Sequence, residues 1–127
     1  MALRLLIVDD NTHFLAAARD LLEREGVTVA GVATTGARAI QLAEALRPDV
    51  VLVDIDLGEE SGFDLAPRLA AGDGTRVVLI SANPEAEFTD LIATSPAVGF
   101  VSKSELSARA VSELLDSRGD IGRGRAT

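Results

Sequence analysis

The chain has 127 residues, 47% of them hydrophobic, which is enough for one compact domain and leaves no room for a second. Its 12 basic and 20 acidic side chains give a formal net charge of −8, so no nucleic-acid-binding face is expected. The absence of cysteine excludes disulfides, thiolate metal sites and a cysteine nucleophile. The apolar runs are too short to span a membrane, and the early acidic pair does not suit a signal peptide. We therefore expect a soluble, cytoplasmic protein.

Short aliphatic runs recur along the chain and alternate with helical patterns. A run that is apolar at nearly every position predicts a strand buried on both faces of a parallel sheet. A weaker run interrupted by a glycine fits an edge strand. In chain order the predicted strands are Leu3–Val8, Val27–Ala33 (the weaker one), Val50–Val53, Val77–Ile80 and Val98–Val101.

The first two helical patterns have clear ends. Asn11 is the expected N-cap of the first helix and Gly26 its stop. Thr35 is the expected N-cap of the second helix, which Pro48 closes.

The later helices are less regular. Pro67 falls inside the third helical pattern, so we expect that helix to begin late, with Asp64 as its N-cap, or to be irregular at its start. Asn83 followed by Pro84 predicts an N-cap and first residue of a short fourth helix. Apolar residues at helical spacing over Leu106–Leu115 predict the last helix.

Five strand–helix alternations predict an α/β fold, a (βα)5 three-layer sandwich with a parallel sheet. We place this domain at residues 1–117. The Gly- and Arg-rich segment 118–127 shows no periodicity, and we expect it to be disordered or to begin a linker.

Functional groups of an open parallel sheet gather beyond the carboxyl ends of its strands. Five polar residues stand at predicted strand ends: Asp9, Asp10, Asp54, Ser81 and Lys103. Any single aspartate there is about as often a helix cap as a functional residue. The convergence of three carboxylates, a hydroxyl and an ammonium on one rim is much harder to explain by capping.

Three neighbouring carboxylates repel one another unless a cation lies between them. Short aspartate side chains supply the oxygen ligands that Mg²⁺ prefers, and one lysine cannot neutralise three acids. Beside such an ion, a carboxylate can attack a phosphoryl group and hold it as an acyl phosphate. Asp54 is the best nucleophile candidate, and Asp9 and Asp10 are the candidate metal ligands.

These residues resemble those of the receiver domain of two-component response regulators, over essentially Leu3 to Ser117. The resemblance rests on the acidic pair, on Asp54 in Val-Leu-Val-Asp-Ile-Asp-Leu, on Ser81, and on Lys103 in Gly-Phe-Val-Ser-Lys. Supporting matches are Gly62, Pro48-Asp49 and Gly99. The resemblance implies a doubly wound, flavodoxin-like sheet of strand order 2-1-3-4-5.

The resemblance also implies a function. Asp54 would take a phosphoryl group from a phosphohistidine of a sensor histidine kinase, and Ser81 and Lys103 would hold phosphoryl oxygens. The chain would be a signalling switch and not an enzyme that turns over a substrate. Mg²⁺, which Mn²⁺ can replace, would be held by Asp9 through water, Asp10, Asp54 and the backbone carbonyl of Asp56.

The resemblance implies that Phe100, in the position of the switch aromatic, turns inward on phosphorylation. That movement would change the face formed by helix 4, strand 5 and helix 5, where a target protein or a second copy would bind. Phe100 lacks the hydroxyl of a tyrosine, and it could equally be an ordinary core residue. The chain could stand alone or be the receiver part of a longer transcriptional regulator.

Asp56 and Asn83 stand two residues after Asp54 and Ser81. We hypothesise that both tune acyl-phosphate hydrolysis, although roles as loop or helix caps are about as plausible. The rival function is an aspartate-nucleophile phosphohydrolase that uses Asp54-Ile-Asp56, but Gly58 stands where such enzymes usually have Thr or Val.

Overall fold

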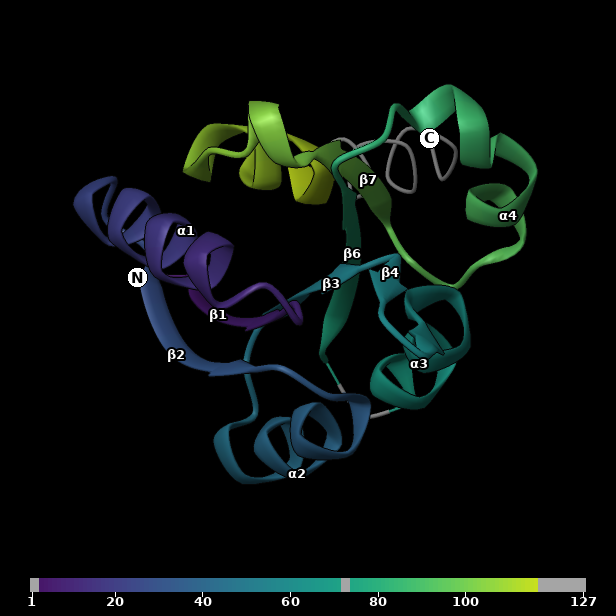
Figure 1. Ribbon diagram of the computed structural model, residues 1–127. Coiled ribbons are helices and arrows are strands. Elements are labelled where there is room, and N and C mark those ends of the chain that lie inside the picture. Colours follow the sequence, from purple (N-terminus) through teal and green to yellow (C-terminus); the bar gives the residue numbers. More distant parts are fainter. Residues whose placement is uncertain (1–2, 72–73, 117–127) are drawn as a thin grey trace, which may run out of the picture.

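A computed structural model describes residues 3–71 and 74–116. Figure 1 shows a central sheet with helices on both of its faces. Its five strands are all parallel, in the order β2-β1-β3-β6-β7, which confirms the expected order 2-1-3-4-5 and the edge position of the glycine-containing strand. The strands are β1 (Arg4–Val8), β2 (Thr28–Ala33), β3 (Val50–Asp54), β6 (Arg76–Ser81) and β7 (Gly99–Ser102).

Helices cover the sheet in two layers. α1 and the C-terminal helix (residues 108–116) lie on one face, and α2, α3 and α4 lie on the other (Figure 1). The bounds are α1 (Thr12–Arg24), α2 (Gly36–Leu46), α3 (Gly62–Ala70) and α4 (Thr89–Thr94), with 3-10 turns η1 (Glu85–Phe88) and η2 (Lys103–Glu105). None of the helices within the described ranges is both long and apolar enough to cross a membrane.

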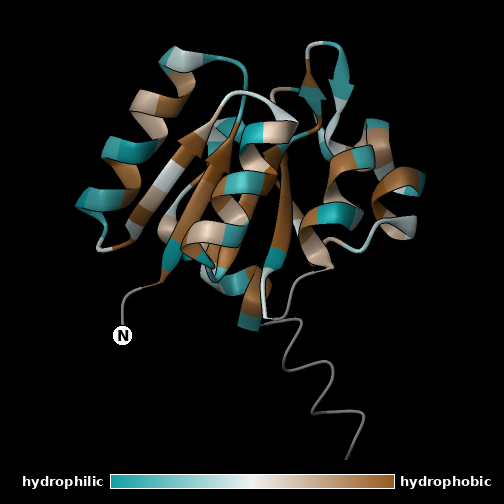
Figure 2. Cartoon of the chain, turned by 90° about the horizontal axis from the view of Figure 1, so that it is seen from below, coloured by the Kyte–Doolittle hydropathy of each residue, from teal (hydrophilic) through white to brown (hydrophobic). Residues whose placement is uncertain are grey.

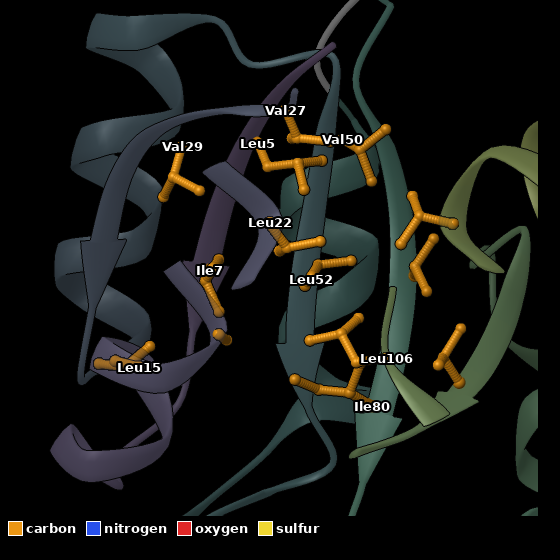
Figure 3. Close-up of a cluster of buried hydrophobic side chains, with 14 of the residues drawn as sticks. Leu5, Ile7, Leu15, Leu22, Val27, Val29, Val50, Leu52, Ile80 and Leu106 are labelled. Carbon is orange, nitrogen blue, oxygen red and sulfur yellow. The ribbon is translucent and has the colours of Figure 1, made fainter. Parts of the chain in front are cut away.

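The core consists of two apolar layers, one on each face of the sheet. Consecutive residues of β1 alternate between them: Leu5 and Ile7 join the layer under α1, and Leu6 and Val8 join the layer under α2 and α3. All four are fully buried, as predicted for strands apolar at every position. Figure 3 shows the first layer, and Figure 2 shows largely apolar strands between helices that carry both polar and apolar residues.

The predicted ends of the first two helices are confirmed. The side chain of Asn11 accepts a hydrogen bond from the backbone N–H of Phe14 at 3.1 Å, and Thr35 accepts one from that of Arg38 at 3.2 Å. Gly26 has φ +92°, the left-handed conformation of a helix stop.

The prediction that Asp64 caps the third helix is wrong. α3 begins at Gly62, and the hydroxyl of Ser61 accepts a hydrogen bond from the backbone N–H of Phe63 at 3.1 Å. Pro67 therefore lies inside the helix and removes one backbone donor. Packing decides the outcome, because α3 buries Leu65, Ala66 and Leu69 against the sheet.

The start of the fourth helix also differs from the prediction. Pro84 is extended, with φ −69° and ψ 151°, and precedes η1 instead of opening an α-helix. No side chain caps η1, so Asn83 is not the predicted N-cap. The last helix begins two residues later than Leu106, because the Ser107 hydroxyl accepts a hydrogen bond from the N–H of Ala110 at 2.9 Å.

A two-stranded hairpin after β3 was not predicted. β4 (Asp56–Leu57) and β5 (Glu60–Ser61) pair antiparallel around Gly58, whose φ is +76°. The side chain of Glu60, the first residue of β5, accepts a hydrogen bond from the backbone N–H of Gly36 at 3.0 Å. This contact connects the hairpin to the start of α2. The predicted tail at residues 118–127 lies outside the described residues.

Candidate functional site

Three carboxylates meet at the carboxyl end of the sheet. Asp9 directly follows β1, Asp10 comes next, and Asp54 is the last residue of β3. One oxygen from each lies within 4.8 Å of the others. Asp9 and Asp54 are buried, whereas Asp10 is exposed at the mouth of the cluster. Because β1 and β3 are adjacent parallel strands, their register brings the three side chains together.

Lys103 completes this acidic pocket. Its Nζ lies 2.6 Å from Oδ2 of Asp9 and 3.2 Å from Oδ2 of Asp54. It follows β7, and only 17% of its side chain is exposed. The pocket therefore holds one cation and three acids, which leaves a net negative charge, as predicted.

A repeated local turn orients the site side chains. In each case the residue two positions later donates its backbone N–H to the side-chain oxygen, which fixes where that oxygen points. The three hydrogen bonds run from Asn11 to Asp9 Oδ1 (2.8 Å), from Asp56 to Asp54 Oδ1 (3.2 Å) and from Asn83 to Ser81 Oγ (3.0 Å). This places Asp56 and Asn83 beside the pocket, and both residues are exposed.

The electrostatics of the pocket follow from this crowding. Burial raises the pKa of Asp54 to about 6, and the charge of Asp9 raises it as well, against the lowering effects of the Asp56 N–H and of Lys103. Burial lowers the pKa of Lys103, but its contacts with Asp9 and Asp54 outweigh burial and raise that pKa above its usual value.

The acidic pocket fits a hard divalent cation. The buried Oδ2 of Asp9 receives no hydrogen bond of good geometry from the described residues; only the ion pair with Lys103 faces it. Three carboxylate groups from short side chains form the oxygen-rich donor set that such a cation needs. The arrangement can hold a cation beside Asp54 and, with it, an anionic group on Asp54.

The other predicted site residues lie near the same rim or behind it. Ser81 ends β6 and is 3% exposed. Phe100 in β7 is buried in the second core layer, and its ring centroid is 6.4 Å from that of Phe88. The ring of Phe14, a residue of α1, lies 4.5 Å from the ammonium of Lys103. No local pattern in the sequence indicates this contact, because Lys103 lies 89 positions further along the chain.

Comparison with known proteins identifies the family. Residues 5–115 match the sequence model of the response regulator receiver domain. The chain belongs to this family. It is therefore a two-component receiver domain with a phosphorylatable aspartate pocket, a signalling switch and not a classical enzyme, so the phosphohydrolase alternative is set aside.

The relatives are regulators of transcription. The receiver is 36% identical over 115 residues to a protein of Pseudomonas aeruginosa named as a transcriptional regulator, covering 85% of this chain and 56% of that protein. It is 32% identical over 101 residues to the DNA-binding transcriptional activator EvgA of Escherichia coli K12, covering 79% and 50%. The chain thus spans about half the length of these relatives.

A solved structure shows the same fold. The signal receiver domain of NarL from Mycobacterium tuberculosis superposes with a TM-score of 0.78 at 30% identity, covering 93% of this chain and 97% of that one. The agreement extends over nearly the whole receiver, so the acidic pocket lies on a complete receiver fold.

Proposed function

We propose that this receiver accepts a phosphoryl group on Asp54 from the phosphohistidine of a sensor histidine kinase, and that phosphorylation switches a protein-interaction surface. The observation that carries the proposal is the position of the buried Asp54 carboxylate between two further carboxylates and the ammonium of Lys103. A cation bound by the acids and the ammonium would flank a phosphoryl group on Asp54 with positive charge. Such flanking charge is what phosphoryl transfer requires.

Mg²⁺ is the cation we propose, with Mn²⁺ as a substitute. It would be held by Asp10 directly, by Asp9 through a water molecule, by the carboxylate of Asp54 and by the backbone carbonyl of Asp56. When bound, the ion would neutralise the acidic pocket and stabilise the charge on the phosphoryl oxygens.

In the transfer step, a carboxylate oxygen of Asp54 forms a bond to phosphorus while the phosphorus–nitrogen bond of the donor breaks. The bonding electron pair leaves with the imidazole nitrogen, which takes up a proton from solvent. Because the pKa of Asp54 is about 6, its carboxylate is mostly ionised and nucleophilic near neutral pH. Lys103 exchanges its contact with Asp54 for one with a phosphoryl oxygen, and the hydroxyl of Ser81 binds a second oxygen.

The output surface we propose is the face of α4, β7 and the C-terminal helix. The switch would couple the movement of Ser81 toward the phosphoryl group to Phe100, whose ring borders this face. A groove there is lined by both apolar and acidic side chains. Its lining includes Phe100, Val101 and Leu114, with Glu85, Glu105 and Glu113 around them. Such a groove supports docking of a target protein or of a second copy of the receiver.

We also propose that the receiver acts in the cytoplasm, either alone or as one part of a longer transcriptional regulator. The relatives, which are about twice as long as the matched segment, favour the second arrangement. The net charge of −8 argues against direct DNA binding by this part.

The test is incubation with acetyl phosphate and Mg²⁺, followed by intact mass measurement. We expect one added phosphoryl group per chain, and none in Asp54→Ala or after chelation of the metal. Asp64→Ala, which removes an exposed carboxylate ten positions further on, is the matched control and should still be modified. An unmodified wild-type chain under conditions that give bound metal contradicts the proposal. Repeated turnover of a generic phosphomonoester would favour a phosphohydrolase instead.

A further inference from the structure

The surroundings of Lys103 carry an inference that rests on the proposed function. Lys103 is the only lysine of the 127 residues, so the acidic pocket depends on one ammonium for its permanent positive charge. That ammonium has anionic neighbours on one side, Asp9 and Asp54, and the ring of Phe14 on another, 4.5 Å from the ring centroid.

The contacts around Phe14 join it to Asn11, Asp9 and Lys103, and each of these four residues contacts the next. Asp9 Oδ1 accepts a hydrogen bond from the N–H of Asn11, and the side chain of Asn11 accepts one from the N–H of Phe14. The ring of Phe14 faces the ammonium of Lys103, which pairs in turn with Oδ2 of Asp9. The capping turn that begins α1 therefore holds both the backbone that carries the Phe14 ring and the carboxylate of Asp9. Both act on the same ammonium.

An aromatic ring attracts a cation through the negative charge of its face, and this attraction grows when water is excluded. The side chain of Phe14 is half-buried and that of Lys103 is mostly buried, so solvent competes weakly here. An aliphatic side chain of similar size would keep the apolar contact but lose the attraction. The ring would also remain beside the ammonium after the contact with Asp54 is exchanged for one with a phosphoryl oxygen.

We propose that Phe14 is a positioning residue for the phosphoryl transfer: its ring holds the ammonium of Lys103 at the place where a phosphoryl oxygen on Asp54 arrives. Phe14 does not touch the reacting atoms. It acts through Lys103, because its ring limits the conformations that the long, flexible lysine side chain can adopt.

The variants that test this are Phe14→Leu, which removes the ring, and Phe14→Tyr, which keeps it. Phe88→Leu is the matched control, because Phe88 is also half-buried but its ring packs on other aromatic rings. Urea unfolding of each variant establishes that it is folded under the assay conditions.

The first measurement does not depend on phosphorylation or metal. Uniform ¹³C-lysine labelling gives the signals of one side chain, and a ring face shifts the ε-methylene protons of Lys103 upfield. We expect this shift in the wild type, in Phe14→Tyr and in Phe88→Leu, and its loss in Phe14→Leu. An unchanged lysine spectrum in Phe14→Leu overturns the proposal.

The second measurement is the rate of phosphorylation by acetyl phosphate as a function of Mg²⁺ concentration. We expect Phe14→Leu to lower the maximal rate about three- to tenfold, with the half-saturating Mg²⁺ concentration unchanged. Phe14→Tyr should keep a maximal rate close to that of the wild type. Equal losses in the Leu and Tyr variants would show a packing role and overturn the proposal. If the wild type takes up no phosphoryl group, the proposed function fails, whereas the lysine spectrum still decides whether the ring holds the ammonium.

Discussion

Replacing Asp54 by asparagine removes the buried carboxylate from the acidic pocket. In the folded protein its pKa is about 6, against 3.8 for an unperturbed aspartate, chiefly because of burial and the charge of Asp9. The folded state therefore binds the Asp54 proton more tightly than the unfolded state does. This contribution to stability is present in full below about pH 4 and is lost as the pH rises through about 6.

The size of the effect follows from the pKa difference. About two pKa units correspond to about 3 kcal/mol. The pocket is open to solvent at its mouth, where Asp10 is exposed, and water there weakens the electrostatic effect. We therefore expect a stability difference of about 2 kcal/mol. Without divalent cations, Asp54→Asn should then be about 2 kcal/mol more stable than the wild type near neutral pH, and nearly equal to it at about pH 4.

Urea unfolding followed by circular dichroism, with a chelator and across this pH range, measures the difference. Asp64→Asn is the matched control, because its carboxylate is exposed on α3. Adding Mg²⁺ should stabilise the wild type and narrow its gap to Asp54→Asn. If the two proteins have parallel pH profiles in chelator, burial and the charge of Asp9 do not raise the pKa of Asp54, which refutes this explanation.

Three further expectations concern the metal, the lifetime of the phosphoryl group and the fold. Mg²⁺ at tenfold its dissociation constant should stabilise the wild type by about 1.4 kcal/mol in thermal unfolding, and Asp10→Asn should lose most of this gain. If Asp56 and Asn83 orient or repel the attacking water, Asp56→Asn and Asn83→Ala will change the acyl-phosphate lifetime, measured by loss of the added mass; unchanged lifetimes leave only a capping role. Gly62→Ala should cost about 1–3 kcal/mol or more in urea unfolding, because its Cβ would overlap the backbone carbonyl of Asp54; a neutral result would mean that the hairpin shifts freely.

The main elements of the fold could be predicted from local patterns. A strand buried on both faces must be apolar at every position, and β1 and β3 show that pattern directly. The caps at Asn11 and Thr35 depend only on a side chain and a backbone N–H three residues apart. Once the strands are parallel, their carboxyl ends share one rim, so the gathering of Asp9 and Asp54 also followed from the sequence.

The start of α3 and the small hairpin could not be predicted in this way. Two-residue strands have no period to detect, so the pairing of β4 with β5 leaves no pattern in the sequence. Pro67 weakens α3 locally, but burial of an apolar helix face outweighs the lost hydrogen bond. Glu60 finds its partner at Gly36, 24 residues away, and nothing local indicates that pairing.

The sequence by itself determined the five main strands, most of the helices and which end of the sheet carries the acids, because these are set by patterns within a few residues. Only the tertiary structure decided that the ring of Phe14 faces Lys103 and that Phe100 packs in the second core layer beside Phe88. These contacts join residues about 90 positions apart or depend on the packing of whole layers. Strand register and helix docking fix them, and neither is encoded in any single segment.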